Sequence, residues 1–226
     1  THVPLSPSFH YLSNVFVHFL GQLGIKVQLV IESYGFYPRG GGIVRAEIFP
    51  VKNIKPLRIM ERGNILQITG YSAVGNLPLS IAERQKDAFA NKINREIKNN
   101  KACLIIELVE VPSIGQGTFV YLEARSEDSV AGFTALGARG KKAEVVGEEA
   151  AEEFVKYYTT GAALDYHIAD QIVLYLSLCS EESRFTTSSI TNHLLTNLWV
   201  INLFHEIQYS IEGKAGEKGM VKIKGY

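Results

Sequence analysis

The spacing of apolar residues divides the first part of the chain into one helix and several strands. Apolar positions three and four apart predict a helix over residues 9–23. Alternating β-branched positions predict strands over residues 26–33 and 43–49. Residues 52–60 add a further short strand and an exposed basic link. We therefore expect a helix followed by a small group of strands in this region.

The pattern starts afresh near Arg62. From there the chain predicts a strand, a charged amphipathic helix, a buried strand, two further strands and a second long helix. Their ranges are 65–73, 81–97, 103–111, 118–125, 130–136 and 142–158. This β-α-β-β-β-α order over about 100 residues is typical of a small self-contained α/β module. We therefore place a domain boundary near residue 62.

A further helix, apolar and predicted over residues 162–179, carries unusual polar positions. His167, Asp170, Gln171 and Leu174 share one face at spacings i, i+3, i+4 and i+7. Polar groups on an otherwise buried helix either line a site or satisfy one another. A closing strand over residues 206–211 and a Lys- and Gly-rich tail over residues 212–226 are expected to follow.

His193 stands in a polar turn immediately before an apolar helical run. Thr191 or Asn192 can act as the N-cap of that helix. The helix is expected to bury one face, formed by Leu194, Leu195, Leu198, Val200, Ile201 and Leu203. The unpaired N–H groups and the positive dipole end favour an anion and disfavour an imidazolium, so a neutral, nucleophilic histidine beside a phosphate suits this place. The alternative is a histidine of the capping region that bonds a neighbouring loop.

Three consecutive glycines, Gly40, Gly41 and Gly42, follow Pro38 and Arg39 between the first two predicted strands. Glycines free the backbone to take positive φ and to approach a ligand closely, while an arginine offers several donors to phosphate. The segment is not a Walker loop, because no Gly-Lys-Ser/Thr follows. The alternative is a glycine-rich hairpin without a ligand.

Composition narrows the class of protein. A chain of 226 residues with 46% apolar residues can bury a sizeable core in one large or two modest domains. Lys plus Arg equals Asp plus Glu at 23 each, so any nucleic-acid binding requires a local patch. The basic run is formed by Lys92, Arg95, Lys98 and Lys101. We interpret it as a solvated helix face, with nucleic-acid contact as the alternative.

The cysteines and the hydropathy indicate the compartment. Cys103 and Cys179 are far apart and lack metal-ligand spacing, which fits unpaired thiols in a reducing compartment. No 18-residue apolar span and no signal peptide are found. We therefore expect a soluble, cytoplasmic protein without a membrane partner.

Four motifs occur in a fixed order: GFYPRGGG at 35–42, MERGN at 60–64, HIADQ at 167–171 and HLLTN at 193–197. With the lead-in THVPLSPSF, they make the chain resemble the RNA 3′-terminal phosphate cyclase family over essentially its whole length. The resemblance implies an α/β (α+β) fold, with a large domain of repeated β-α-β-α-β-β units and a smaller inserted α/β domain.

The resemblance also implies the domain boundaries. Residues 1–61 and 162–226 would belong to the large domain, and residues 62–161 would form the insert. The family's glycine-rich N-terminal third, which helps to hold the nucleotide, is not part of this sequence. We therefore expect the chain to correspond to the last two-thirds of a cyclase.

The activity implied is the ATP-dependent conversion of an RNA 3′-phosphate to a 2′,3′-cyclic phosphate. His193 matches the histidine that becomes covalently adenylylated, and Asp170 matches an aspartate that orients this histidine or contacts the nucleotide. Mg²⁺ or Mn²⁺ would accompany ATP, and RNA with a 3′-terminal phosphate would be the partner. The resemblance leaves open whether the protein is a monomer or a homodimer.

Further residues are expected at the nucleotide. Gln171 would bond a phosphate oxygen, and His167 stands where some members carry a tyrosine that stacks on adenine. Pro7 matches a residue on the opposite face of the base. Arg39, Gly40 and Gly41 are candidates for backbone or phosphate contact.

Two alternatives stay open. The first is a catalytically inactive, cyclase-like protein of ribosome biogenesis, a class that lacks the nucleophile; the intact HLLTN motif argues against it. The second is an inert fragment, because a nucleotide pocket without one wall should bind ATP poorly.

Overall fold

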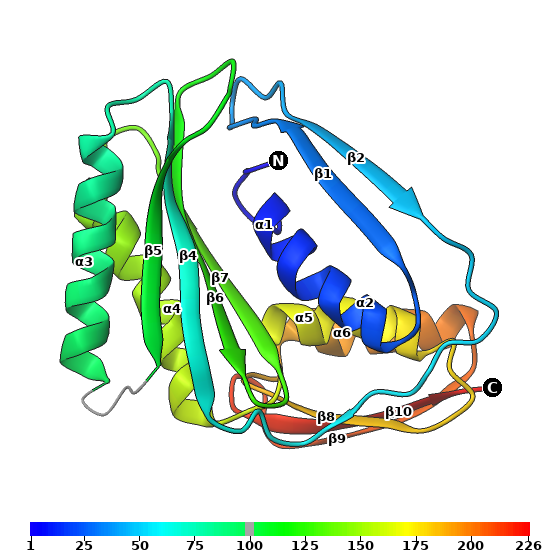
Figure 1. The fold of residues 1–226 in the computed structure, drawn as a ribbon. Coiled ribbons are helices and arrows are strands. Elements are labelled where there is room, and N and C mark those ends of the chain that lie inside the picture. The colour runs from blue at the N-terminus through cyan, green and yellow to red at the C-terminus, as the bar shows by residue number, and fades with distance from the viewer. Residues whose placement is uncertain (98–101) are drawn as a thin grey trace.

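The computed structural model describes residues 1–97 and 102–226, in which helices pack against three sheets (Figure 1). Lys98 and Lys101 of the basic run lie outside the described residues. No helix within the described ranges is long and apolar enough to cross a membrane. The mixture of helices and sheets confirms the expected α+β class.

A helical rod and a hairpin form the first part of the chain. The rod is continuous, and Ser8 caps it by accepting a hydrogen bond from the Tyr11 N–H at 3.3 Å. The predicted helix and both predicted strands are confirmed, with a π-helical turn inside the rod. The elements are α1 (Phe9–Tyr11), η1 (Leu12–Phe16), α2 (Val17–Gln22), β1 (Val27–Ser33) and β2 (Ile43–Ile48).

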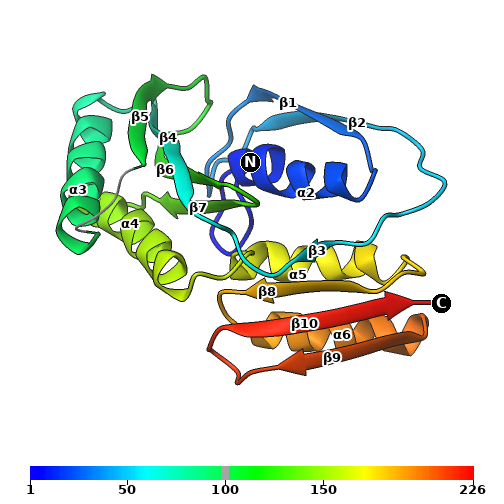
Figure 2. The same cartoon turned by 60° about the horizontal axis from the view of Figure 1, so that its bottom comes forward.

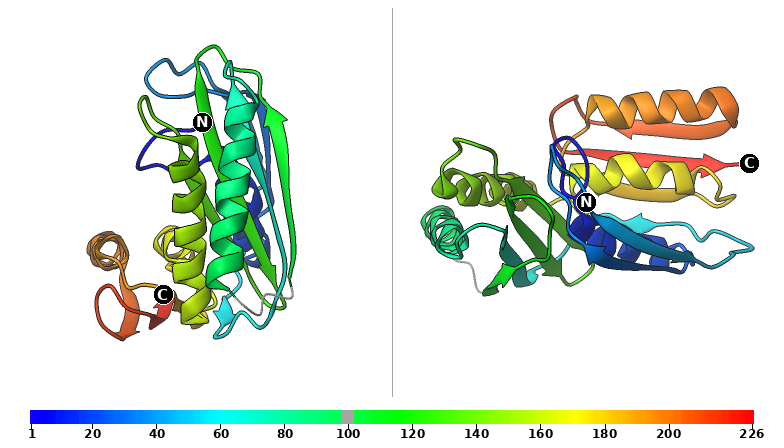
Figure 3. Two further views of the ribbon diagram at one scale, coloured as in Figure 1. Left: turned by 90° about the vertical axis from the view of Figure 1, so that its left-hand side faces the viewer. Right: turned by 90° about the horizontal axis from the view of Figure 1, so that it is seen from above.

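The second group of elements forms a four-stranded sheet, with strand order β5-β4-β6-β7, covered by two helices. Figure 3 shows these helices side by side on one face of the sheet. The elements are β4 (Ile65–Gly75), α3 (Ser80–Glu96), β5 (Cys103–Glu110), β6 (Gly117–Ser126), β7 (Val130–Leu136) and α4 (Ala143–Thr160). The predicted β-α-β-β-β-α order is confirmed.

One expectation for this group is wrong, because β5 is not a buried strand. It lies at the edge of the sheet, paired only to β4 among the described strands. Most of its residues are exposed, Ile105 to 44% and Leu108 to 36%. The continuous apolar run of β5 is compatible with a buried strand. The position of β5 at the edge of the sheet, however, leaves part of the strand open to solvent.

The third group combines a four-stranded sheet, ordered β3-β8-β10-β9, with two helices on one face (Figure 2). Strand β3 is parallel to β8, and the other pairs are antiparallel. The tail beyond residue 212, for which no strand was expected, contributes the inner strand β10. The elements are β3 (Arg58–Ile59), α5 (Tyr166–Leu176), β8 (Ser183–Thr187), α6 (Asn192–Phe204), β9 (Ile207–Glu212) and β10 (Gly219–Gly225).

Helix α6 carries more apolar surface than the neighbouring elements cover. Of the residues expected to form its buried face, Leu194 and Leu198 are buried, whereas Leu203 is 62% exposed. Phe204 and Trp199 are also largely exposed. Apolar residues surround this helix, but the sheet and α5 cover only part of its circumference. The expectation of one fully buried face is therefore wrong.

Two hydrophobic cores hold these layers together. One lies within residues 65–160, between the β4–β7 sheet and the helices α3 and α4. The other is shared: the opposite side of the same sheet contributes Phe119 and Tyr121 to a cluster with Tyr11 of α1 and Ile168 of α5. Because this second core joins residues 65–160 to the remainder, the position of the sheet is fixed relative to α5.

Two histidines lie in this shared interface, His2 buried and His10 half-buried. The His2 ring stacks on the Phe119 ring with centroids 4.2 Å apart. The ring centroids of His10 and Tyr71 are 5.0 Å apart. The Tyr34 hydroxyl and His10 Nε2 are 3.2 Å apart. Burial lowers the pKa of His10 to about 4, and burial followed by the nearby His10 lowers the pKa of His2 to about 3. Both imidazoles are therefore neutral at pH 7.

We expect this pair to make the fold sensitive to mild acid. The unfolded chain protonates both imidazoles below their ordinary pKa of 6.5, whereas the folded chain does so only near 4 and 3. The free energy of unfolding is therefore highest above pH 6.5 and falls as the pH drops toward 4, by roughly 2–3 kcal/mol from His10 alone. Urea unfolding at pH 7.0 and 4.5 should show a smaller pH effect for His10→Phe than for the wild type. Equal pH effects would contradict this account.

Candidate active site

The N-terminal halves of α5 and α6 lie side by side and carry the polar residues that the sequence singled out. Asp165 caps α5, and Thr191 caps α6 by accepting a hydrogen bond from the Leu194 N–H at 3.0 Å. Of the two N-caps expected for α6, the structure therefore selects Thr191. His193 is the second residue of this helix and is exposed, so its ring is open to a reactant.

Asp170 is held against the start of α6. Its Oδ1 accepts a hydrogen bond from Thr191 Oγ1 at 2.6 Å, and its backbone oxygen accepts one from Asn197 Nδ2 at 2.9 Å. Burial raises the pKa of Asp170, while the Thr191 hydrogen bond and the neighbouring His167 and His193 act in the opposite direction. Thr191 thus connects the carboxylate to the helix end that carries His193.

The contact between Asp170 and His193 is indirect. Among the hydrogen bonds of residues 1–97 and 102–226, none joins these two side chains, although the histidine is near enough to act on the pKa of the carboxyl. The arrangement places a carboxylate, an exposed imidazole and the free N–H groups of a helix end at one spot. Such a spot suits an anionic, phosphate-bearing ligand.

His167 and Gln171 complete the group on α5. The exposed His167 ring lies 4.0 Å from the Tyr166 ring and meets Tyr11 edge-on at 5.9 Å. The Oε1 atom of Gln171 is buried and has no hydrogen-bond partner among the described residues. A buried acceptor without a partner costs free energy, so a ligand that donates a hydrogen bond would be stabilised here.

Of the remaining candidates, Arg39, Gly40 and Gly41 lie apart from this group. Gly40 and Gly41 have φ of 67° and 83° in the turn between β1 and β2, where a Cβ on Gly41 would meet Ile114 Cδ1 at 2.7 Å. A Cβ on Gly115 would likewise meet Arg39, so this turn packs on the β5–β6 loop. In Figure 1 the turn is at the top and α5 and α6 lie near the bottom. Pro7 is exposed, next to the Ser8 cap.

Sequence reasoning missed two residues next to the site, Asp165 and Tyr11. Both are hydrogen-bonded at the start of α5. The Tyr11 hydroxyl donates to Asp165 Oδ1 at 2.8 Å, across 154 positions of the chain. An aspartate just before a helix is a common N-cap, and this signal was available in the sequence. It went unused because the helix was expected to begin at residue 162, whereas α5 begins at Tyr166.

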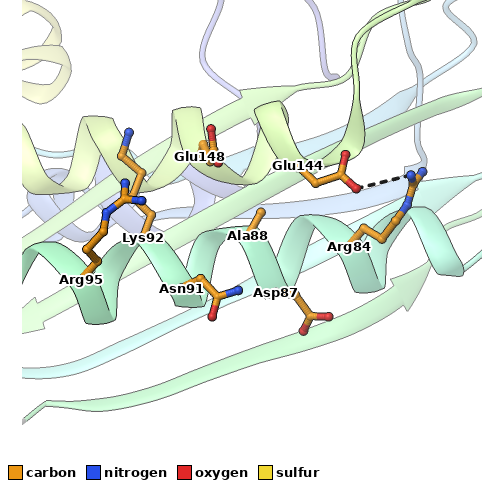
Figure 4. A pocket seen from close by; sticks show the side chains of 8 residues that line it. All are labelled: Arg84, Asp87, Ala88, Asn91, Lys92, Arg95, Glu144 and Glu148. Carbon is orange, nitrogen blue, oxygen red and sulfur yellow. Dashed lines mark hydrogen bonds and ion pairs between the residues drawn. The ribbon is translucent and has the colours of Figure 1, made fainter.

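The described part of the basic run lies in a groove between α3 and α4 (Figure 4). Arg84 pairs with Glu144 at 3.4 Å, and Lys92 pairs with Glu152 at 3.3 Å. Acidic residues therefore alternate with the basic ones, and the exposed Arg84–Glu144 pair contributes little to stability, whereas the Lys92 side chain is only 14% exposed. This mixed charge favours the interpretation of Lys92 and its neighbours as a solvated helix face.

Comparison with known proteins gives one matching family model and several similar proteins. The family model described as RNA 3′-terminal phosphate cyclase matches residues 1–211. The chain belongs to this family. Cyclases of Methanopyrus kandleri, Thermococcus kodakarensis and Methylococcus capsulatus are 39%, 38% and 37% identical to it, over 99%, 99% and 100% of this chain. The chain spans 64%, 64% and 62% of the length of these three cyclases.

Proposed function

We propose that this chain carries the nucleotidyl-transfer site of an ATP-dependent RNA 3′-terminal phosphate cyclase, acting in the cytoplasm on RNA with a 3′-terminal phosphate. The observation that supports this most is the exposed His193 at the N-terminus of α6, beside an Asp170 held in place by Thr191. Membership of the cyclase family adds the reaction class.

The proposed reaction has three displacements. A neutral imidazole nitrogen of His193 attacks the α-phosphorus of ATP, and the bond to pyrophosphate breaks to leave AMP on the histidine. An oxygen of the RNA 3′-phosphate then attacks that phosphorus and releases His193, forming RNA-(3′)pp(5′)A. Finally the vicinal 2′-hydroxyl attacks the RNA phosphorus, which closes the 2′,3′-cyclic phosphate and expels AMP. A covalent intermediate divides one difficult transfer into easier steps.

Each residue of the site has a role in the proposed reaction. The N–H groups at the start of α6 would stabilise the phosphate, and the helix dipole favours the neutral form of His193. Asp170 would stabilise positive charge that develops on the imidazole. Gln171 would contact the nucleotide: its orphaned Oε1 can accept from a hydroxyl or amino group, and only its amide nitrogen can donate to phosphate. His167 would stack on the adenine, opposite Pro7.

The proposal includes Mg²⁺ or Mn²⁺. Residues 1–97 and 102–226 contain no group of three or more His, Cys, Asp or Glu side chains that could hold a metal. Mg²⁺ is commonly bound by one or two carboxylates together with substrate phosphates, and Asp170 is the carboxylate at this site. The ion would neutralise part of the negative charge on the departing pyrophosphate.

The test of this function is a conversion assay on the longest gene product that contains the chain, and in parallel on the chain alone. RNA with a 3′-phosphate should become resistant to phosphatase in the presence of ATP and Mg²⁺. RNA with a 2′-deoxy terminal nucleotide should not cyclise, because it lacks the attacking hydroxyl. Unchanged 3′-phosphate would contradict the proposal and favour the inactive, cyclase-like alternative. Activity confined to the longer product would identify the chain as an incomplete enzyme.

Thr191 provides a narrower prediction. Thr191→Val should remove both the cap of α6 and the hydrogen bond to Asp170, whereas Thr191→Ser keeps the hydroxyl. We expect the valine variant to lose about 1 kcal/mol of stability and to slow adenylylation roughly tenfold. The serine variant should stay close to the wild type in thermal unfolding and in single-turnover labelling. Similar rates for the wild type and the valine variant would remove Thr191 from the site.

A further inference from the structure

Asp165 is a fully buried carboxylate at the start of α5. Its Oδ1 accepts hydrogen bonds from the backbone N–H groups of His167 and Ile168, at 2.9 and 3.0 Å, and from the Tyr11 hydroxyl at 2.8 Å. Its Oδ2 accepts from the Gly132 N–H at 3.2 Å. All four partners donate to the carboxyl oxygens; burial raises the pKa of Asp165, while the neighbouring His167 and the hydrogen bonds act in the opposite direction.

These four contacts exceed the needs of a helix cap. Thr191 caps α6 with one hydroxyl, and the two N–H groups of α5 would suffice for Asp165 in the same role. The other two donors come from α1 and from β7, which are separate parts of the fold. Burying a carboxylate is costly unless it is fully hydrogen-bonded, so joining three elements through it needs a reason beyond capping.

The junction around Asp165 leaves little room for movement. A Cβ on Gly132 would meet the Tyr11 ring and the Val15 side chain, each at 2.8 Å. Tyr11 and Val15 belong to the helical rod, and Gly132 belongs to β7. The absence of a side chain at Gly132 therefore allows the strand to approach the rod closely enough for both to reach Asp165.

A hydrogen-bonded route leads from this junction to the proposed nucleophile. Asp165 fixes the first turn of α5, which presents His167 and, one turn later, Asp170. Asp170 binds Thr191, the residue that caps the helix of His193. The orientation of the β4–β7 sheet is thereby transmitted to the site.

We propose that Asp165 is a positioning residue that aligns α5, and with it His167 and Asp170, against His193. This inference rests on the proposed function, because it concerns the adenylylation of His193. Asp165 acts through α5 and does not touch the reacting atoms. Its loss should therefore change the rate of the covalent step more than the binding of ATP.

The test compares Asp165→Asn and Tyr11→Phe with the wild type. Asparagine is as good an N-cap as aspartate, so Asp165→Asn keeps the cap of α5 but turns an amide group toward the Gly132 N–H. Tyr11→Phe removes one hydrogen bond and keeps the ring. The control is Asp87→Asn on α3, which lies on the opposite side of the β4–β7 sheet from α5 (Figure 1).

Single-turnover labelling with α-labelled ATP measures the rate and the half-saturating ATP concentration, and circular dichroism measures the folded fraction. We expect Asp165→Asn to slow labelling roughly 10- to 100-fold and Tyr11→Phe several-fold, with half-saturation within about threefold of the wild type. The control should match the wild type. Unchanged rates in both variants, or a loss that only follows the unfolded fraction, would overturn the proposal.

A second readout does not depend on activity. The imidazole NMR resonances of His167 and His193 should shift in Asp165→Asn and stay in place in Asp87→Asn, because only the first change moves α5. Resonances that stay in place in both variants would overturn the positioning role. A wild-type protein that never takes label contradicts the proposed function instead, and the imidazole resonances then test the geometry alone.

Discussion

Replacing His193 by alanine should abolish the covalent attachment of AMP, with the rate falling by at least roughly 10³-fold. The proposed nucleophile is one atom of one exposed ring, and the neighbouring Asp170 and Thr191 side chains are hydrogen-bonded to each other at 2.6 Å. The measurement is acid-labile label from α-labelled ATP after a denaturing gel. His193 is exposed, so the variant should fold normally.

A matched control separates loss of the nucleophile from loss of any histidine. His18 lies on α2, where its Nε2 is 2.9 Å from Gln22 Nε2. His18→Ala should retain the label at the wild-type level. Label that persists in His193→Ala would contradict the assignment of the nucleophile, whatever the behaviour of the control.

Replacing Gly147 by alanine should destabilise the fold by roughly 3 kcal/mol or more. Gly147 lies in α4, and a Cβ there would meet the Gln85 backbone oxygen of α3 at 2.1 Å. Backbone atoms cannot rotate away from this overlap, so α3 and α4 must separate along the buried core between them. Helix propensity alone predicts the opposite sign, because alanine favours a helix over glycine by about 1 kcal/mol.

Gly21 supplies the matched control for that change. It lies in α2, and nothing within 4 Å would meet its Cβ. Gly21→Ala should therefore stabilise the protein by roughly 0.5–1 kcal/mol. Urea unfolding of both variants should give free energies that move in opposite directions. A stabilised Gly147→Ala would contradict the close contact of α3 with α4.

The elements with a regular apolar period were predictable from the sequence. Strand β7 and the helices α3, α4 and α6 occur within a few residues of their expected ranges. Strand β10 has the alternation of a half-buried strand, with Lys222 and Lys224 beside the buried Val221 and Ile223, but it was missed because the surrounding segment is dominated by charge and glycine. Its inner place in the sheet depends on pairing with β8 and β9, which no local pattern reports.

The candidate site was predictable as far as it is local in sequence. His167, Asp170 and Gln171 share one helix face, and His193 follows its cap by two residues, so spacing alone groups them into two clusters. The contacts that join distant segments could not be predicted in this way. The hydrogen bond from Tyr11 to Asp165 is one example, and the packing of the Arg39 turn on Gly115 is another. Both depend on how the β4–β7 sheet sits against the remainder.

The most direct test of the central claim is the chemical location of AMP on the protein. The longest gene product that contains this chain should be incubated with ATP and Mg²⁺, digested under neutral conditions and analysed by mass spectrometry. A protease that cleaves after Trp199 or Leu203 separates His193 from His205, and we predict AMP on the peptide that contains His193 and not on those that contain His167 or His205. AMP on another residue, or no adenylylated peptide in a preparation that cyclises RNA, would contradict the account.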